Sequence, residues 1–290
     1  MEKKRVFSKS LLLLAITSIM LFAMSITSMA ATETDMNIQQ TGSSSSKVDI
    51  TWKTYLGQNI HYHVEMSYDG INWAMQEYTY NPNETIYGLT EGSSYYVRIS
   101  VYNKDFHSTD SSKDGNLVAV SQKQLVSTNP SKVQNLRQTK ATKNSISMTW
   151  DAVAGASSYK ILIFENYDYK TVATSKTNSV TIKGLDASSN IEYYVAAVKN
   201  VNGYEAVGDR SKSVDMKTVP KKVTRVAITD LYDNIKVCYY GWTSCENADG
   251  YQYEITSLKG KKKYYKATTT STSARLTTYP AVSYTHLRAH

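Results

Sequence analysis

Residues 46–52 read SKVDITW, and residues 144–150 read NSISMTW. In both stretches apolar side chains alternate with polar ones, and the stretch ends on a tryptophan. A period of two is typical of a β-strand with one buried face. Residues 235–242, IKVCYYGW, end on a third tryptophan after a similar run. The three stretches predict equivalent strands, each with one large core side chain.

The tryptophans return at the spacing of a whole small domain. Trp52 and Trp150 are 98 residues apart, and Trp242 follows after a further 92. A short loop and a tyrosine-containing strand follow each of them. Self-similarity of this length indicates tandem domains. Because no long segment has a helical period and short alternating runs are frequent, we predict an all-β fold of tandem β-sandwiches.

A second motif supports this prediction. Residues 88–99 read GLTEGSSYYVRI, in which a leucine precedes a long alternating strand with a tyrosine near its start. Together with the tryptophan, this pattern resembles the fibronectin type III family. The resemblance is carried by Trp52, Leu89 and Tyr95, by Trp150, Leu185 and Tyr193, and by Trp242. It implies fibronectin type III-like (immunoglobulin-like) sandwiches with these residues in the structural core. It implies little about function, because this fold has unrelated roles.

The repeats define the expected domains. Residues 31–46 are polar and end in four serines, so we expect a flexible leader there. Fibronectin type III-like domains are expected at 47–128, at 130–219 and, in part, at 220–281. The third lacks the long strand of the other two, so we expect it to leave sheet edges open.

The first 30 residues have the layout of a secretory signal peptide. A basic head from Lys3 to Lys9 precedes the uncharged stretch 11–26, and Ser28-Met29-Ala30 is a small-x-small cleavage site. An uncleaved anchor is the alternative, but a spanning helix needs about 20 apolar residues. We expect cleavage, secretion to the extracellular space or cell surface, and no membrane span in the mature chain.

The last nine residues, 282–290, read VSYTHLRAH. This string matches the translation of a transposase adapter used in sequencing libraries, and such scars are excluded from fold reasoning. We therefore expect the natural sequence to run only to about Ala281 here and to belong to a longer, bacterial-type protein.

Charge excludes one class of partner. The net charge is +8, of which the first 30 residues contribute +3 and the tail +1, which leaves +4. Such a mildly basic surface is not the footprint of nucleic-acid binding. We expect no nucleic acid among the partners.

Cys238 and Cys245 are the only cysteines. In an oxidising compartment they can form a disulfide, and their separation permits a bridge without specifying it. Two free thiols are the alternative.

The sequence offers little chemistry. His61 and His63 are two apart on a predicted strand, a spacing that can bind a metal, but without a visible third ligand we expect two solvated histidines. The acidic residues form no evident acid–base pair, and no phosphate-binding loop or hydrolase motif occurs. We expect no catalytic residue, no metal and no cofactor in this part of the protein.

Two surface patches are candidates for binding. Trp73, Tyr78 and Tyr80 are expected on the outer part of the first domain, where exposed rings can stack on sugars. Ordinary edge packing is the alternative. The lysine-rich segment 259–266 can meet anionic wall polymers, with a solvated hairpin turn as the alternative.

The expected function is that of a secreted or cell-surface, non-catalytic interaction or spacer protein. Its expected partner is an extracellular glycan, a cell-wall polymer or a protein. The alternative is the accessory module region of a secreted carbohydrate-active enzyme whose catalytic domain is missing from this fragment. Sequence beyond Ala281 would separate the two: paired carboxylates in a catalytic domain favour the enzyme, and further sandwiches with a wall-binding segment favour adhesion.

Overall fold

The computed structural model describes residues 31–104, 115–232, 237–257, 263–276 and 282–289. All regular secondary structure in these residues is β-strand, which confirms the predicted all-β class. In this described part, no helix is long and apolar enough to cross a membrane. The predicted signal peptide, residues 1–30, and residues 259–262 of the lysine-rich segment lie outside the described residues.

Packing divides the chain into two compact units. The first comprises the chain up to Val133 with Ala152–Lys160 and Ala196–Ser211, and the second comprises Gln134–Asp151, Ile161–Val195 and the chain from Lys212 onward. All strands of the first repeat belong to the first unit.

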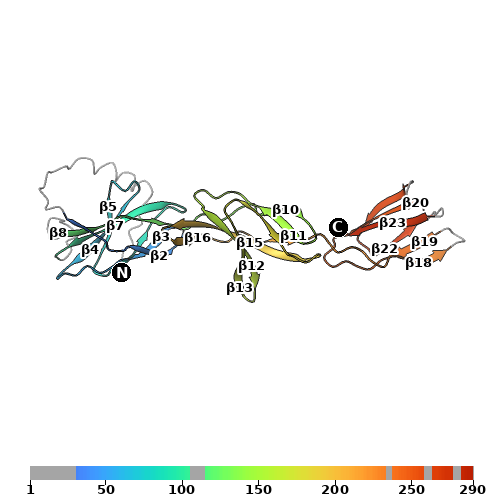
Figure 1. Ribbon diagram of the computed structural model, residues 1–290, viewed down its shortest axis with the longest axis horizontal. Coiled ribbons are helices and arrows are strands. Elements are labelled where there is room, and N and C mark those ends of the chain that lie inside the picture. The colour runs from blue at the N-terminus through green and yellow to red at the C-terminus, as the bar shows by residue number, and fades with distance from the viewer. Residues whose placement is uncertain (1–30, 105–114, 233–236, 258–262, 277–281, 290) are drawn as a thin grey trace, which may run out of the picture. The chain divides into compact units, whose positions relative to one another are not determined.

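Two sheets form the first repeat (Figure 1). Its strands are β1 (Thr32–Thr34), β2 (Gln39–Ser43), β3 (Lys47–Thr51), β4 (His61–Ser67), β5 (Ala74–Thr79), β6 (Asn83–Tyr87), β7 (Ser94–Tyr102), β8 (Leu117–Ser121) and β9 (Gln124–Ser127). One sheet has the order β1-β8-β7-β4-β5, with β9 also paired to β7, and the other has the order β2-β3-β6. β1 runs parallel to β8, whereas β4 is antiparallel to both of its neighbours.

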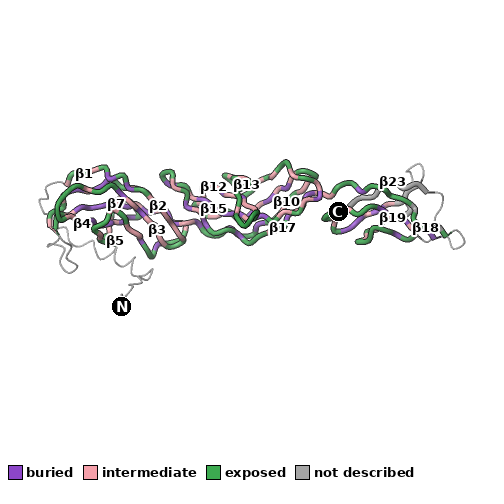
Figure 2. Tube along the Cα trace, turned by 90° about the horizontal axis from the view of Figure 1, so that it is seen from below, coloured by how far each residue is buried: buried purple, intermediate pink, exposed green. Residues whose placement is uncertain are grey.

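The core of the first repeat lies between these sheets. Val48 on β3 belongs to one buried cluster with Val64 on β4 and Val97 on β7, and all three are fully buried. Figure 2 shows the buried runs along β4 and β7 in purple. Side chains from both sheets thus fill one interior, which is the arrangement of a β-sandwich.

The flexible leader predicted for residues 31–46 is wrong. β2 pairs with β3, from Gln39 opposite Thr51 to Ser43 opposite Val48. Met36 and Ile38 are buried in the same core. The physical reason is that these two apolar side chains, spaced by two, cover core that β3 would otherwise leave to water. Of the four serines that suggested a leader, Ser43 ends β2 and the other three lie between β2 and β3.

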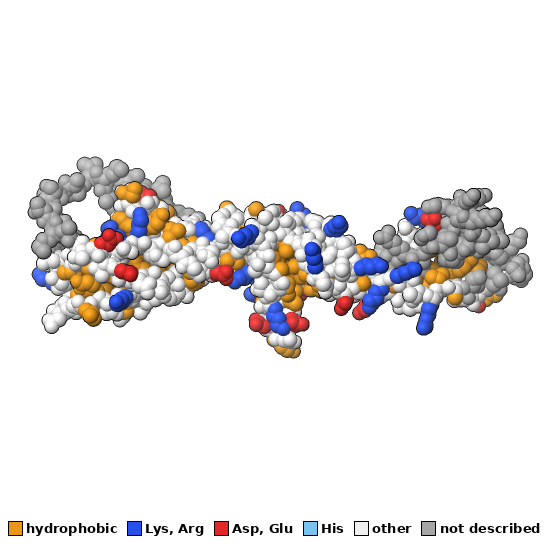
Figure 3. Space-filling model, in the orientation of Figure 1, with side chains coloured by type: hydrophobic (Ala, Val, Ile, Leu, Met, Phe, Trp, Pro, Cys, Tyr) orange, Lys and Arg blue, Asp and Glu red, His pale blue; other side chains and the backbone are white. Residues whose placement is uncertain are grey.

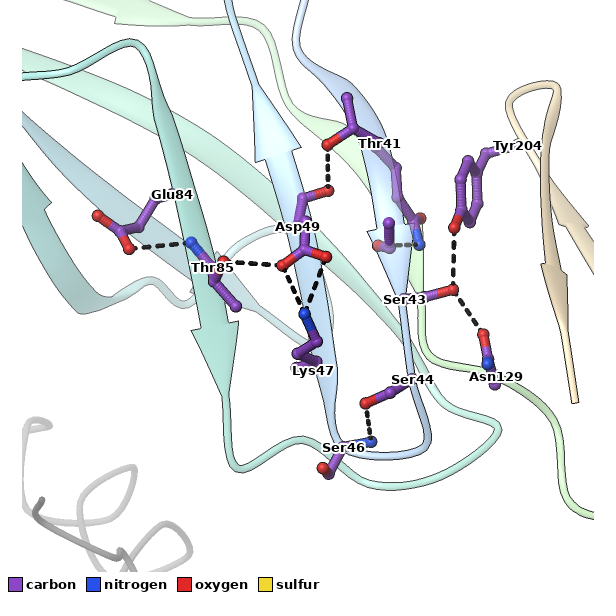
Figure 4. Close-up of polar contacts among 12 residues, drawn as sticks. Thr41, Ser43, Ser44, Ser46, Lys47, Asp49, Glu84, Thr85, Asn129 and Tyr204 are labelled. Carbon is purple, nitrogen blue, oxygen red and sulfur yellow. Dashed lines mark hydrogen bonds and ion pairs between the residues drawn. The ribbon is translucent and has the colours of Figure 1, made fainter. Parts of the chain in front are cut away.

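Polar groups hold the small sheet β2-β3-β6 (Figure 4). Asp49 accepts hydrogen bonds from Lys47 Nζ at 3.1 Å and from Thr85 Oγ1 at 2.7 Å. Burial opposes ionisation of Asp49, but these bonds and the Lys47 charge outweigh it and hold the pKa below its ordinary value. At the end of β2, Ser43 Oγ donates to Asn129 Oδ1 at 2.5 Å and lies 3.1 Å from the Tyr204 hydroxyl. Internal hydrogen bonds therefore satisfy these polar groups.

The other repeats follow the same plan. Their strands are β10 (Arg137–Ala141), β11 (Ser145–Thr149), β12 (Ser158–Glu165), β13 (Asp168–Ser175), β14 (Ser179–Lys183), β15 (Asn190–Val201), β16 (Tyr204–Val207), β17 (Val214–Lys217), β18 (Ala227–Tyr232), β19 (Val237–Gly241), β20 (Tyr251–Ser257), β21 (Lys263–Thr269), β22 (Ser273–Leu276) and β23 (Val282–Ala289). The sheet orders are β10-β11-β14, β13-β12-β15-β16 with β17 on β15, β18-β19-β22 and β21-β20-β23. A three-stranded sheet and a second sheet built around the strand after the tryptophan recur each time.

One hydrogen bond recurs in all three repeats. In each, a buried tyrosine on the strand after the tryptophan uses its hydroxyl to accept an N–H bond from the loop between them. The pairs are Tyr62 with Tyr55 at 3.0 Å, Tyr159 with Val153 at 2.9 Å, and Tyr251 with Cys245 at 2.9 Å. The tryptophans Trp52, Trp150 and Trp242 are 4%, 1% and 6% exposed. The tyrosine thereby ties the loop to the core that the tryptophan fills.

The remaining residues expected in the core divide into two groups. Leu89, Tyr95 and Tyr193 are buried, whereas Leu185 is half-buried. The Tyr95 hydroxyl accepts the Thr90 N–H at 2.8 Å, which pins the corner before β7. Burial raises the pKa of Tyr193.

A strand not expected from the sequence completes a sheet of the third repeat. Residues 282–289 form β23, antiparallel to β20, with Tyr251 opposite Ala289 and Ser257 opposite Val282. One of the sheet edges expected to be open in the third repeat is therefore occupied. The physical reason is that a strand edge presents unpaired N–H and C=O groups, and an extended segment satisfies them.

The two cysteines considered for a disulfide, Cys238 and Cys245, are not bonded to each other in this structure. Both cysteines are free, and Cys238 lies buried in the core of the third repeat. Cys245 Sγ instead donates to the Lys221 carbonyl at 3.3 Å, and burial raises the pKa of its thiol. A raised pKa keeps this thiol protonated, and thiolate is the reactive form.

Replacing Trp150 by alanine should unfold the second repeat. Removing a fully buried indole costs about 3–5 kcal/mol, which approaches the whole stability of a small domain. Calorimetry of the full chain should lose the transition that belongs to this repeat. The matched variant Tyr159→Phe removes only the hydroxyl that accepts the Val153 N–H and should cost about 1 kcal/mol. A sharp, unshifted transition in Trp150→Ala would contradict the expected core role.

Candidate functional site

The strongest candidate surface is the outer side of the sheet β5-β4-β7 in the first repeat. Since successive side chains on a strand point to opposite faces, core residues alternate there with residues that face away. Register places His63 between Tyr78 and Ser100, and Glu65 opposite Arg98. We call this side the outer face and define it by His61, His63, Glu65, Trp73, Tyr78, Tyr80, Arg98, Ser100 and Tyr102.

An ion pair organises one end of the outer face. Arg98 Nε lies 2.7 Å from Glu65 Oε2, and the Ser100 hydroxyl donates to the same oxygen at 2.7 Å. The Arg98 guanidinium carbon lies 4.4 Å from the centre of the Trp73 ring, a cation–π contact. The three interactions hold the half-buried Trp73 against the sheet. They also neutralise the charges of Glu65 and Arg98 within the face.

A turn between β4 and β5 presents Trp73. The Asp69 carboxylate accepts hydrogen bonds from the backbone N–H groups of Asn72 and Ile71, both at 2.8 Å, and from the Ser67 hydroxyl at 2.8 Å. These bonds, the backbone ones first, hold the pKa of Asp69 well below its ordinary value of 3.8. The turn that precedes Trp73 is thus ordered by one ionised side chain.

Histidines and tyrosines occupy the other end. His61 and His63 were expected to be solvated, and that prediction is wrong, because they are 0% and 6% exposed. The physical reason is the neighbouring strand: the Tyr102 ring stacks 5.4 Å from His61 and lies 4.3 Å from His63. Tyr80 adds a third ring, 6.1 Å from His61. Aromatic side chains therefore help to cover both imidazoles.

A hydrogen bond joins the two histidines. His61 Nδ1 bonds the Lys104 carbonyl, and a carbonyl only accepts, so this nitrogen must carry hydrogen. The Nε2 atoms of His61 and His63 lie 3.0 Å apart, so one of them donates to the other. In the described residues, no group of three His, Cys, Asp or Glu side chains is placed to hold a metal ion. The pair therefore acts as a hydrogen-bonded support for the rings around it.

The residues predicted to bind sugar fall into two places on this face. Tyr78 and Tyr80 are 42% and 52% exposed, and their rings lie edge to face with centres 6.4 Å apart. Trp73 precedes the first residue of β5, whereas Tyr80 follows the last, so Trp73 stands at the opposite end. The roles of Glu65, Arg98 and Tyr102 were not predicted from the sequence. The period of two along β4 and β7 was the available signal, but pairing those strands required their register.

The second repeat matches the model of a known protein family. Residues 131–211 match the family described as "Fibronectin type III domain". The matched stretch is similar to a fibronectin type III domain. It includes Trp150, Leu185 and Tyr193, and the outer face of β5-β4-β7 lies before it in the sequence. Domains of this family generally serve non-catalytic interaction or spacer roles and are common in extracellular proteins.

Other comparisons add little. No curated protein matches the sequence. The crystal structure of the chicken CNTN1 FN1–FN3 domains is 13% identical, with 87% of this chain and 90% of that chain covered and a TM-score of 0.32. The structure of FN3tt mut is 16% identical, with 31% and 97% covered and a TM-score of 0.27. Both TM-scores are too low for these two structures to support the fold assignment. That assignment rests on the strands described above and on the family match at residues 131–211.

The Asp69 turn should survive mild acid. Because its folded pKa is depressed, the carboxylate contributes stability above its ordinary pKa and loses it only as pH falls through the folded value. The amide resonances of Ile71 and Asn72 should therefore stay unchanged from neutral pH down to about pH 4. Asp69→Asn, as the control, should disturb both amides at neutral pH. An amide titration centred near the ordinary carboxyl value would contradict this account.

Proposed function

We propose that the protein is a secreted or cell-surface, non-catalytic interaction protein that binds an extracellular glycan through the outer face of β5-β4-β7. The observation that carries the proposal is the grouping of the exposed Tyr78 and Tyr80 rings over a buried histidine pair, on the same sheet side as Trp73. The basic, then apolar, first 30 residues support secretion.

The chemistry of the face suits sugar. Aromatic rings offer apolar platforms for the C–H faces of sugar rings, and nearby polar groups orient the hydroxyls. Tyr78 and Tyr80 supply rings that also end in a hydroxyl. Packing restrains the Tyr80 ring, since it lies near His61, whose two ring nitrogens are both engaged. A rigid ring loses little conformational entropy on binding.

The charges of the face favour a neutral ligand. Glu65 is engaged by Arg98 and Ser100, so neither member of the ion pair presents an uncompensated charge. An anionic wall polymer would gain more from unpaired lysine or arginine side chains. A neutral polysaccharide is therefore the ligand class that we propose, and a wall polymer or a protein partner is an outcome of the test.

Removing the two tyrosine rings should weaken polysaccharide binding. The full mature chain is tested against insoluble cellulose, chitin and peptidoglycan, with the double variant Tyr78→Thr/Tyr80→Thr, since threonine suits a strand. We expect at least about tenfold weaker binding, because exposed aromatic anchors dominate binding free energy. Melting temperatures are measured in parallel.

The control variant is Tyr87→Thr on β6, which removes a 70% exposed ring from the other sheet. It should bind as the unmodified chain does. Equal loss in the control, undiminished binding by the double variant, or no binding of the unmodified chain to any of the three polysaccharides would refute the proposal.

A further inference from the structure

A two-residue turn joins β12 to β13 in the second repeat. Asn166 and Tyr167 are the two central residues, and both have positive φ, 54° and 64°. Turns of this kind match the twist of a hairpin, and asparagine followed by glycine is their preferred sequence. Here a tyrosine occupies the position at which glycine is favoured.

Tyrosine at this position is costly to the fold. A Cβ atom in the left-handed region crowds the backbone, and a bulky residue there is an outlier. Tyr167 is 97% exposed, so burial does not repay the cost. A strained residue of this kind points to a role outside the fold.

Further apolar side chains surround the turn. Phe164 and Val172 are 49% and 43% exposed, and the Phe164 ring lies 4.9 Å from Tyr169. Tyr169 packs edge-on against Tyr194 of β15, with ring centres 5.1 Å apart. Figure 3 shows hydrophobic side chains at the end of the protruding hairpin, with acidic and basic side chains just behind them. We call Phe164, Tyr167, Tyr169 and Val172 the tip patch.

The charged side chains behind the tip patch are partnered. Lys170 Nζ lies 2.7 Å from Glu165 Oε2, and Lys160 Nζ lies 2.6 Å from Glu205 Oε2. The Asp168 carboxylate accepts its neighbouring Tyr169 N–H at 2.7 Å. The patch thus combines exposed rings with one ion pair and one further carboxylate, so it offers no excess positive charge to an anionic polymer.

We infer that the tip patch is a second contact surface for a neutral sugar polymer, with the Tyr167 ring as its platform. The ligand class rests on the proposed function, whereas the existence of the surface rests on the strain and exposure of Tyr167. A polymer repeats the same sugar many times, so two surfaces on one chain can gain avidity from it, which a single sugar cannot provide.

The test uses Tyr167→Gly in the full mature chain, with binding isotherms on insoluble cellulose and chitin. Glycine relieves the positive φ, so the melting temperature should stay equal or rise. Binding should nevertheless weaken at least about fivefold, the loss of one aromatic anchor. The matched control is Asn166→Gly, which relaxes the adjacent turn residue but keeps the ring, and it should bind as the unmodified chain does.

The outcomes separate this inference from the proposed function. If the double variant Tyr78→Thr/Tyr80→Thr loses binding and Tyr167→Gly does not, the tip patch is refuted and the outer face stands. If Tyr167→Gly loses binding and the double variant does not, the tip patch stands and the outer face is refuted. Equal loss in Asn166→Gly, or no polysaccharide binding by the unmodified chain, overturns the inference.

Discussion

The architecture depends on one buried tryptophan in each repeat, beside which a tyrosine hydroxyl accepts a hydrogen bond from a loop N–H. Tyr62, Tyr159 and Tyr251 each bond the loop that leads from the tryptophan to their own strand. A buried hydroxyl without a partner would cost about 1–3 kcal/mol, so the bond and the burial of the ring require each other. The bond ties the first sheet to the second through one short loop. It thereby holds β4, β12 and β20 close to the tryptophan of the same repeat.

That constraint leaves the opposite side of each strand available for other chemistry. In the first repeat, the side of β4 that faces away from the core carries His61, His63 and Glu65, which organise rings and charges from neighbouring strands. In the second repeat, β12 and β13 form a hairpin whose turn holds a strained, exposed tyrosine. Neither arrangement is needed to build a sandwich. Both put aromatic rings on a surface without excess positive charge, which is why a neutral sugar is the ligand class that they favour.

The fold could be predicted from the sequence because the tryptophans and the alternating strands report local burial. The leader was mispredicted because Met36 and Ile38 are the only two members of their alternating run. A run of two apolar residues is too short to be recognised as a strand among polar residues. The burial of His61 and His63 could not be predicted because Tyr102, which stacks on both, lies some forty residues later. Tyr78 and Tyr80 were visible as alternating aromatic residues. The strain at Tyr167 was not visible, because it depends on a turn whose length follows from hairpin register.

Hydroxyl-radical footprinting of the full mature chain, read by mass spectrometry, tests the central claim that the aromatic outer surfaces contact sugar. The chain is oxidised alone and in the presence of cellohexaose or chitohexaose. We predict that at least one of these sugars reduces the oxidation of Tyr78, Tyr80 and Tyr167, while Tyr87, an exposed ring on the other sheet, reacts unchanged. Equal oxidation of all four tyrosines with and without either sugar would contradict the account.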